Sequence, residues 1–269
     1  MLKFKVSGLV LSALSLLLAL AGHLAQAGDA ISSDRPDIAD SPDVVGRGRL
    51  QLELGLAGDT SKIEGQRLRS LSTPFLLRFG LSEDWELRLD GDGRQSSHAS
   101  NAPGATGWGD LGLGAKWHLN DGNGDGEGSK GMPALGLLGH LTFATGSGGF
   151  RGRGTRPELD LALGWELPQG FDLSVMPGLY RDRNDAGQSY TGGVLAVSLG
   201  KSFSERLQGF IELAGQKLAA SKNGGKVLTL ATGLTYQLTP DLQLDAAVFR
   251  GLNKQSPDWQ WTTGLSTRF

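Results

Sequence analysis

The chain contains no cysteine among its 269 residues. A disulfide framework and a thiolate metal site are therefore excluded. It also has no excess of positive charge, because 26 lysines and arginines stand against 28 acidic residues. Lys3 and Lys5 belong to the N-terminal leader described next, and without them 26 minus 2 leaves 24 basic residues. Nucleic-acid binding requires a basic footprint, so the charge balance argues against a nucleic-acid partner.

Long apolar runs are missing after the first twenty residues. Leu9–Leu20 is apolar but shorter than the about 20 residues of a transmembrane helix. The run follows two lysines and precedes Ala25-Gln26-Ala27, a small-x-small cleavage motif. This order predicts a secretory signal peptide over residues 1–27, with an uncleaved anchor as the alternative. The mature chain would begin at Gly28.

Glycine is abundant, with 42 residues in the chain, about twice the usual ~7%. The excess suits turns and a crowded barrel interior. Hydrophobic residues make up an ordinary 39%. A transmembrane β-barrel needs apolar residues only at alternate positions, so ordinary hydropathy is compatible with one.

The last eleven residues form an amphipathic strand that stops on an aromatic residue. The side chains of one face are Trp259, Trp261, Thr263, Leu265, Thr267 and Phe269. The ending resembles the C-terminal signal by which outer-membrane barrels are recognised, which predicts the barrel-assembly machinery as a partner. The last strand of such a barrel pairs with the first.

Eleven further segments alternate between apolar and polar residues. The twelve predicted strands are 49–57, 68–79, 85–91, 109–119, 134–144, 158–167, 171–180, 190–203, 207–217, 227–238, 242–250 and 259–269. We therefore predict an all-β fold, a transmembrane antiparallel up-and-down barrel of about 12 strands over residues 48–269. Residues 28–47 form a periplasmic segment that could plug it. A secreted β-sandwich is the soluble alternative.

The connections between these strands fall into two alternating classes. Short turns are expected at 81–84, 168–170, 204–206 and 239–241. Long polar loops are expected at 58–67, 92–108, 145–156, 181–189, 219–226 and 252–258, and 120–132 is a long exception among the turns. Bacterial barrels have short periplasmic turns and longer outer loops, so both termini would be periplasmic.

Eight aromatic residues occur at the predicted periplasmic strand ends, all with lipid-facing parity. They are Phe79, Trp85, Trp117, Trp165, Phe171, Phe203, Tyr236 and Phe269. An aromatic girdle at the membrane interface accounts for this pattern. A β-sandwich would scatter them. The pattern predicts a location in the bacterial outer membrane, with lipids and lipopolysaccharide around the barrel.

Charged and polar side chains have the opposite parity and are the candidates for lumen selectivity. They are Arg49, Glu53, Arg78, Glu86, Arg88, Asp90, Asp110, Lys116, His118, His140, Asp160, Glu212 and Asp245. They either pair to keep the interior polar or form a field that selects solutes. Twelve strands lie between the filled barrels of about 8 and the open channels of about 16, which favours a narrow or gated passage.

Three motifs allow a site other than a channel. His118 and His140 share the lumen face, but we predict no metal, no cofactor and no Ser/His catalysis, because no serine nucleophile motif accompanies them. The segment 121–127 imitates a calcium loop, yet Met132 occupies the position of the bidentate glutamate. Arg151, Arg153 and Arg156 suit either phosphate binding or a soluble loop.

Asp34-Arg35-Pro36-Asp37 precedes the first strand, either as part of a plug or as a turn with a local ion pair. Together with Thr73–Ser82, Trp85–Leu89, Gly107–Lys116 and Thr142–Gly146, this motif resembles the meta-pathway phenol-degradation family of outer-membrane proteins. The resemblance covers about residues 33–269. It implies a barrel that passes small, often hydrophobic or aromatic, compounds.

The sequence thus favours an outer-membrane channel or transporter for small organic solutes. The alternatives are a closed structural or surface-binding barrel and a lipid-modifying outer-membrane enzyme. The channel is not expected to be an enzyme.

Overall fold

The computed structural model describes residues 30–63, 65–100, 102–122 and 131–269. The predicted signal peptide and most of the calcium-like segment 121–127 lie outside these residues. The helical elements described are three single turns, η1 Gly148–Phe150, η2 Pro168–Gly170 and η3 Ser221–Asn223. None of the helices in these ranges is long and apolar enough to cross a membrane.

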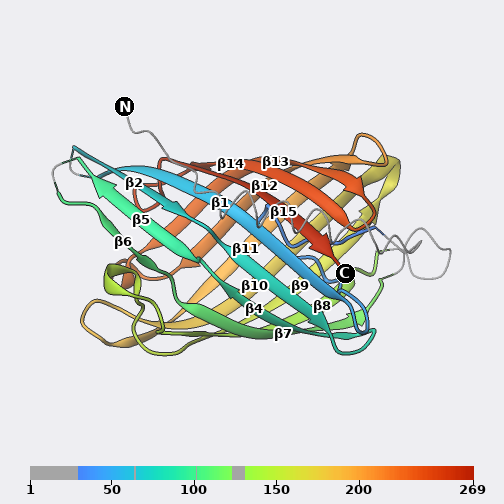
Figure 1. Cartoon of the computed structure of the whole chain (residues 1–269), viewed down its shortest axis with the longest axis horizontal. Helices are drawn as coiled ribbons and strands as arrows, with labels where there is room; N and C mark the ends of the chain where they lie inside the picture. Colours follow the sequence, from blue (N-terminus) through green and yellow to red (C-terminus); the bar gives the residue numbers. More distant parts are fainter. Residues whose placement is uncertain (1–29, 64, 101, 123–130) are drawn as a thin grey trace.

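The described chain also contains fifteen β elements (Figure 1). They are β1 Leu50–Ile63, β2 Gln66–Ser72, β3 Phe75–Gly80, β4 Trp85–Gly91, β5 Arg94–Ala99, β6 Ala105–Trp108, β7 Leu111–Asn120, β8 Ala134–Phe143, β9 Arg156–Leu167, β10 Phe171–Arg183, β11 Ser189–Ser202, β12 Leu207–Leu218, β13 Lys226–Thr239, β14 Leu242–Gly251 and β15 Trp259–Arg268.

Three pairs of these elements act as single barrel strands. The first part of β1, residues 50–54, pairs with β3, and its second part, residues 57–63, pairs with β2. β2 and β3 are therefore one strand interrupted at Thr73-Pro74. In the same way β4 continues as β5, and β6 continues as β7. The result is a closed antiparallel barrel of 12 strands, which confirms the predicted fold.

The last strand closes the barrel against the first. β15 pairs with β1 from Arg268 opposite Gln51 to Trp259 opposite Thr60. The backbone N–H of Phe269 extends this ladder by donating to the carbonyl of Leu50 at 2.8 Å. Closure leaves no open sheet edge, which an apolar bilayer would not tolerate. The predicted pairing of last and first strands is confirmed.

Two predicted outer loops are wrong, because strands occupy them. β1 runs to Ile63 and β2 begins at Gln66, which replaces the loop 58–67. β5 and β6 fill most of the loop 92–108, so the strand predicted at 85–91 is not short. Arg94–Ala99 reads Arg-Gln-Ser-Ser-His-Ala, without an apolar stripe. The outward face of a strand needs apolar residues only within the hydrocarbon layer, so alternation could not reveal this extension.

The three interruptions lie side by side on neighbouring strands, at Thr73-Pro74, Asp92-Gly93 and Gly109-Asp110. Proline has no N–H for the ladder. Gly93 has a φ of +60°, and a Cβ there would lie 2.2 Å from the carbonyl oxygen of Thr73. Glycine therefore permits the close approach of the two strands where the wall bends.

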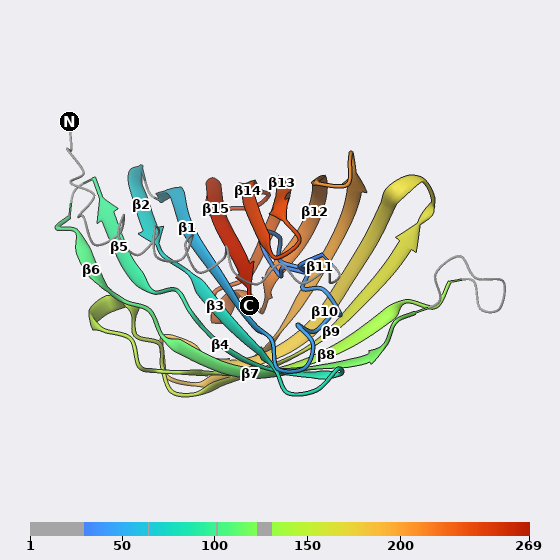
Figure 2. The same cartoon turned by 45° about the vertical axis from the view of Figure 1, so that its right-hand side comes forward.

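Burial in this barrel is the inverse of that in a soluble protein. The largest fully buried side chains are all polar: Arg78, Lys116, Gln51, Glu53, Glu86, Glu212, Thr229 and Ser266. Leucines cover the outer wall, and Leu213 is 54% exposed. Figure 2 shows the strands enclosing the lumen. An apolar belt outside and polar groups inside are the properties of a membrane-spanning barrel.

The eight predicted girdle residues lie near the end of the barrel that carries the turns 81–84, 168–170, 203–206 and 240–241, here called the short-turn rim. Trp85 of β4 and Trp117 of β7 stack there with ring centroids 5.1 Å apart. Phe203 is the most exposed of the eight, at 62%. The opposite end is called the long-loop rim.

We expect the cost of a charge on the outer wall to depend on its depth. Leu213→Arg, at the middle of β12, should lower the free energy of unfolding by about 2–4 kcal/mol. Leu238→Arg, near the short-turn rim, should cost about 0–1 kcal/mol. Guanidinium titrations in liposomes, followed by tryptophan fluorescence, measure both. Equal losses of unfolding free energy in the two variants would contradict the placement of this outer wall in lipid.

Candidate functional site

Residues 31–48, here called the N-terminal segment, fold into the barrel before β1 begins. The backbone N–H of Ile31 donates to the carbonyl of Pro240 at the short-turn rim, at 2.7 Å. The segment returns to the same rim, where the N–H of Gly48 donates to the carbonyl of Gly80 at 2.8 Å. Between these points it crosses the lumen (Figure 2).

The segment reaches every barrel strand. The wall residues that it meets, in order from β1 to β15, are Glu53, Arg78, Glu86, Lys116, Gly136, Gly164, Met176, Ser198, Glu212, Ala231, Asp245 and Thr262. The glycines matter because a Cβ at Gly136 would lie 2.8 Å from Pro42 Cα. Contacts on all sides place the segment across the whole lumen.

Asp34 is the centre of the polar contacts on one side. Its carboxylate accepts bonds from the ammonium of Lys116 at 2.8 and 3.0 Å. It also pairs with Arg88 and with Arg78, whose Nη1 lies 3.4 Å away. The three cations come from β7, β4 and β3. One carboxylate of the N-terminal segment therefore forms ion pairs with side chains of three different strands.

Arg78 donates hydrogen bonds to further acceptors besides its ion pair with Asp34. Arg78 binds Glu86 with two N–H groups, at 2.9 and 3.0 Å, and Glu53 at 3.2 Å. It also donates to the backbone carbonyls of Ser32 and Asp43, both at 2.9 Å. A buried ion pair is maintained only when its remaining donors also find partners, as they do here.

The segment's carboxyl groups respond differently to their surroundings. Burial by itself would raise the pKa of Asp34, but the charges of Arg78, Lys116 and Arg88 lower it far below its ordinary value. Burial and the Asp34 carboxylate raise the pKa of Asp40 to about 6, although Arg88 opposes the shift. Burial and the neighbouring Glu212 raise the pKa of Asp37. These groups lie outside the membrane-spanning strands.

Arg35 fastens the segment to the closing strands. Its guanidinium donates two bonds to Asp245 of β14, at 3.0 and 3.2 Å, and one to Thr262 of β15 at 2.7 Å. Glycines make room for it, since a Cβ at Gly55 or Gly264 would lie 2.4 Å from guanidinium nitrogens. Arg35 thus binds across the seam between the last strands and the first.

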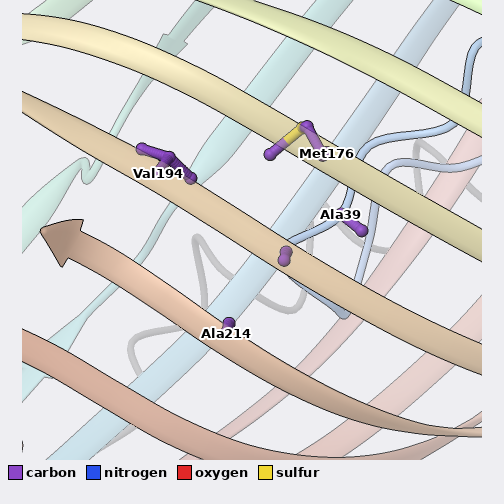
Figure 3. Packing of buried hydrophobic residues seen from close by; sticks show 5 residues of the cluster. Ala39, Met176, Val194 and Ala214 are labelled. Atoms are coloured by element: carbon purple, nitrogen blue, oxygen red, sulfur yellow. The ribbon is translucent and has the colours of Figure 1, made fainter.

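The opposite side of the segment makes apolar and backbone contacts. Ala39 packs in a buried cluster with Met176, Val194, Ala196 and Ala214 of β10–β12 (Figure 3). The backbone N–H groups of residues 38 and 39 donate to the Glu212 carboxylate at 2.8–3.1 Å. Within the described residues, no ion pair joins the segment to this side.

The barrel holds two chambers, and the N-terminal segment lines the inner one. The inner chamber, on the short-turn side, has a volume of about 1170 Å³ and is lined by the segment and by Trp165 and Asp172. The outer chamber, toward the long-loop rim, has a volume of about 600 Å³. Phe75, Tyr180 and Glu158 are among the residues that line it. Pockets of this size suit small molecules.

The other predicted lumen residues have varied positions. His118 bonds to the carbonyl of Pro42 at 3.1 Å, whereas His140 pairs with Asp90 at 2.7 Å in the outer half. Asp160 is 8% exposed. Arg49 precedes β1 and is not among the residues that form ion pairs around Asp34.

Asp110 holds the loop 145–156 at the mouth of the outer chamber. Its carboxylate accepts bonds from the N–H groups of Gly146 and Gly152 and from Arg156, each at 2.8 Å. Arg153 instead pairs with Asp185 of a neighbouring loop at 3.4 Å. Of the arginines considered for phosphate binding, these two are thus engaged with aspartates.

The inward parity of Gln51 and Ser266 was visible in the sequence, yet their role in holding the segment was not predicted. Gln51 donates to the carbonyl of Ser32 at 2.9 Å. The hydroxyls of Ser33 and Ser266 lie 2.8 Å apart. Small polar residues of this kind carry no signal until the segment's path is known.

A family model described as "Putative MetA-pathway of phenol degradation" matches residues 33–269. Among solved structures, the chain is similar to an outer membrane channel from Pseudomonas putida F1, with 14% identity and a TM-score of 0.68 over 87% of this chain and 100% of that one. It is also similar to a KdgM porin in complex with disordered oligogalacturonate, with 11% identity and a TM-score of 0.51 over 81% of this chain and 99% of that one. Its similarity to the NanC porin has 13% identity and a TM-score of 0.50 over 80% of this chain and 98% of that one. No curated protein matches the chain. At these identities, the likeness to solved structures concerns the outer-membrane barrel fold.

We expect Asp34→Asn to loosen the N-terminal segment without opening the barrel. Removing one partner of a buried ion pair costs about 3–5 kcal/mol, so protection of residues 32–45 against hydrogen exchange should fall roughly 100-fold or more. Mass spectrometry of the purified protein measures this. The matched control is Asp185→Asn, which breaks the exposed pair with Arg153 and should leave protection unchanged. Equal protection in both variants would contradict the central role of Asp34.

We expect docking of the segment to strengthen as the pH falls from 7 to 5. Docked Asp40 takes up its proton near pH 6 and released Asp40 near its ordinary 3.8, so the docked state binds more protons within this window. The gain should be roughly 1 kcal/mol, with Asp37 acting in the same direction. Hydrogen-exchange protection factors at the two pH values measure the change. Asp40→Asn should diminish it, and a rise of protection with pH would refute it.

Proposed function

Because the chain belongs to the family described as "Putative MetA-pathway of phenol degradation", as its motifs led us to expect, we propose that it is an outer-membrane channel for small organic solutes. Hydrophobic and aromatic compounds are among the solutes proposed. The N-terminal segment closes the passage and must rearrange when a solute crosses.

One observation carries this proposal: the N-terminal segment contacts the wall on all sides within a closed barrel that also holds two solute-sized chambers. The wall around them is apolar outside, which supports a location among outer-membrane lipids and lipopolysaccharide. The terminal strand, which ends in Phe269, supports delivery by the barrel-assembly machinery. The similar solved structures named above are channels and porins, and they lend weight to transport over catalysis.

The segment is better suited to movement than to permanent closure. Its strongest contacts are ion pairs on the side of β3, β4 and β7, where Asp34 binds three bases. The side of β10–β12 offers alanines, a methionine and one carboxylate that accepts backbone bonds. Small side chains bury little area, so separation on that side costs less. We therefore infer that the segment swings away from β10–β12 and stays attached at Asp34.

A closed structural barrel is the second candidate, and the full ring of contacts favours it. The two candidates differ in whether any solute crosses. Liposome flux of the purified protein decides between them.

We expect a disulfide between the segment and the wall to stop solute flux. Asp37→Cys with Ser198→Cys places two thiols where the side chain of the segment is now hydrogen-bonded to β11, on the side that is proposed to separate, and the chain itself contains no cysteine. Uptake of a radiolabelled aromatic solute into liposomes should be lost in the oxidised variant and restored by reductant.

The control is Ser32→Cys with Ser41→Cys, because those hydroxyls lie 3.2 Å apart within the segment itself. This disulfide should not tether the segment to the wall, so flux should continue. Flux through the oxidised Asp37–Ser198 variant would refute the moving segment. No flux through any reduced protein would refute the channel and leave the closed barrel.

A further inference from the structure

The last part of β1 and the elements β2, β5 and β6 prolong the wall at the long-loop rim (Figure 1). Side chains alternate between the two faces of a strand, so the outward face of β1 continues from Leu56 to Lys62. On β2 the outward face comprises Arg67, Arg69 and Leu71, because these residues lie opposite outward residues of β1. Both strands thus change from leucine to lysine or arginine where they leave the apolar belt.

One row of outward side chains crosses five strands. From β14 to β5 the row consists of Arg250, Trp259, Thr60, Arg69 and His98, each directly opposite the next. Side chains that are directly opposite have Cβ atoms about 4.5–5.5 Å apart and share one face of the sheet. The guanidinium carbon of Arg250 lies 4.9 Å from the centre of the Trp259 ring. The row therefore brings two arginines and a histidine onto one continuous surface.

Two further pairs add bases to this surface. Lys62 lies opposite Arg67, and both side chains are exposed. Like charges directly opposite each other are destabilising, so an anion between them would relieve their repulsion. Arg94 of β5 lies opposite Trp108 of β6, which is 58% exposed. The five residues here called the basic face are Lys62, Arg67, Arg69, Arg94 and Arg250.

The basic face lacks a counter-ion within the described residues. None of its five bases forms an ion pair there. Asp59 of β1 has inward parity, and its carboxylate accepts a bond from the hydroxyl of Ser70. Arg250 donates one bond to the backbone carbonyl of Asp258, at 2.8 Å, which brings no negative charge. The cations of the basic face are therefore available to an anion from outside the described chain.

An apolar row lies beside the basic one, toward the middle of the wall. It comprises Val248, Trp261, Gly58 and Leu71, again directly opposite one another. A Cβ at Gly58 would lie 2.8 Å from the indole of Trp261, so this ring covers the strand at the glycine. Tryptophan is enriched where a membrane meets water. The two rows therefore place an apolar surface at the edge of the bilayer and bases immediately outside it.

This order matches the lipid of the outer leaflet. Bacterial barrels carry their longer loops on the cell exterior, so the basic face lies on that side. There the leaflet contains lipopolysaccharide, whose lipid A carries phosphate groups above its acyl chains. Arginine binds phosphate with paired N–H donors, and several bases near an anionic surface add their attractions. A soluble anion could use the bases but would gain nothing from the apolar row.

We propose that the basic face binds the phosphate groups of lipopolysaccharide while the apolar row contacts its acyl chains. The bound lipid supplies the negative charge that this part of the wall lacks. It also covers the strand ends that extend beyond the apolar belt. This inference depends on the outer-membrane location and is independent of whether any solute crosses the barrel.

The test compares the full-length protein with a triple variant that combines Lys62→Gln, Arg67→Gln and Arg69→Gln. Native mass spectrometry in detergent measures the binding of bisphosphorylated lipid A. The triple variant should bind this lipid roughly tenfold more weakly. Removal of one phosphate from the lipid should weaken its binding to the unaltered protein, and should change its binding to the triple variant less.

The matched control combines Arg206→Gln, Lys222→Gln and Lys254→Gln, which remove three exposed charges from turns and loops and should keep the affinity. Unchanged affinity in the triple variant, or an equal loss in the control, would overturn the site. Equally tight binding of phosphatidylglycerol would also overturn it, because the face would then attract any anionic lipid. Full displacement of lipid A by an equal concentration of inorganic phosphate would do the same. The heat-dependent shift of folded barrels on gels confirms that each variant is assembled.

Discussion

Closure of the sheet is the constraint on which the rest of this structure depends. Backbone N–H and C=O groups in lipid must be paired within the protein, so the strand that ends at Arg268 has to meet the strand that begins at Leu50. Once the wall is closed, side chains that alternate along each strand must point either to lipid or into one enclosed space. Polar residues are therefore concentrated in a small lumen, where they need partners.

The N-terminal segment meets that need on one side of the lumen and leaves it unmet on the other. Asp34 compensates three bases of β3, β4 and β7, and Arg35 compensates Asp245 on β14. Toward β9–β12 the segment presents Asp37 and Asp40 to a wall that is already acidic. The unequal division explains why the side of β3, β4 and β7 suits a fixed attachment of the segment.

Much of the fold followed from the sequence, because alternation is a local property. Arg78, Glu86 and Lys116 had inward parity, and their side chains lie in the lumen. The strands near the long-loop rim were missed, since Arg94–Ala99 lies where no apolar stripe is required. The interruption at Thr73-Pro74 also divided into two elements a strand that parity treats as one. Strands were predicted correctly where their outward side chains must be apolar to face lipid, and they were missed where those side chains face water.

The candidate site was only partly predictable. Asp34-Arg35-Pro36-Asp37 stood out as a motif, but a local ion pair explained it equally well. In the structure, Asp34 binds bases that follow it by 44, 54 and 82 positions at Arg78, Arg88 and Lys116. The sequence alone determined the barrel, its closing strand and the inward parity of the acids and bases, because each depends on period-two alternation. Only the tertiary structure decided that the segment crosses the lumen and which carboxylate meets which cation, because those pairings arise from closing twelve strands around one segment.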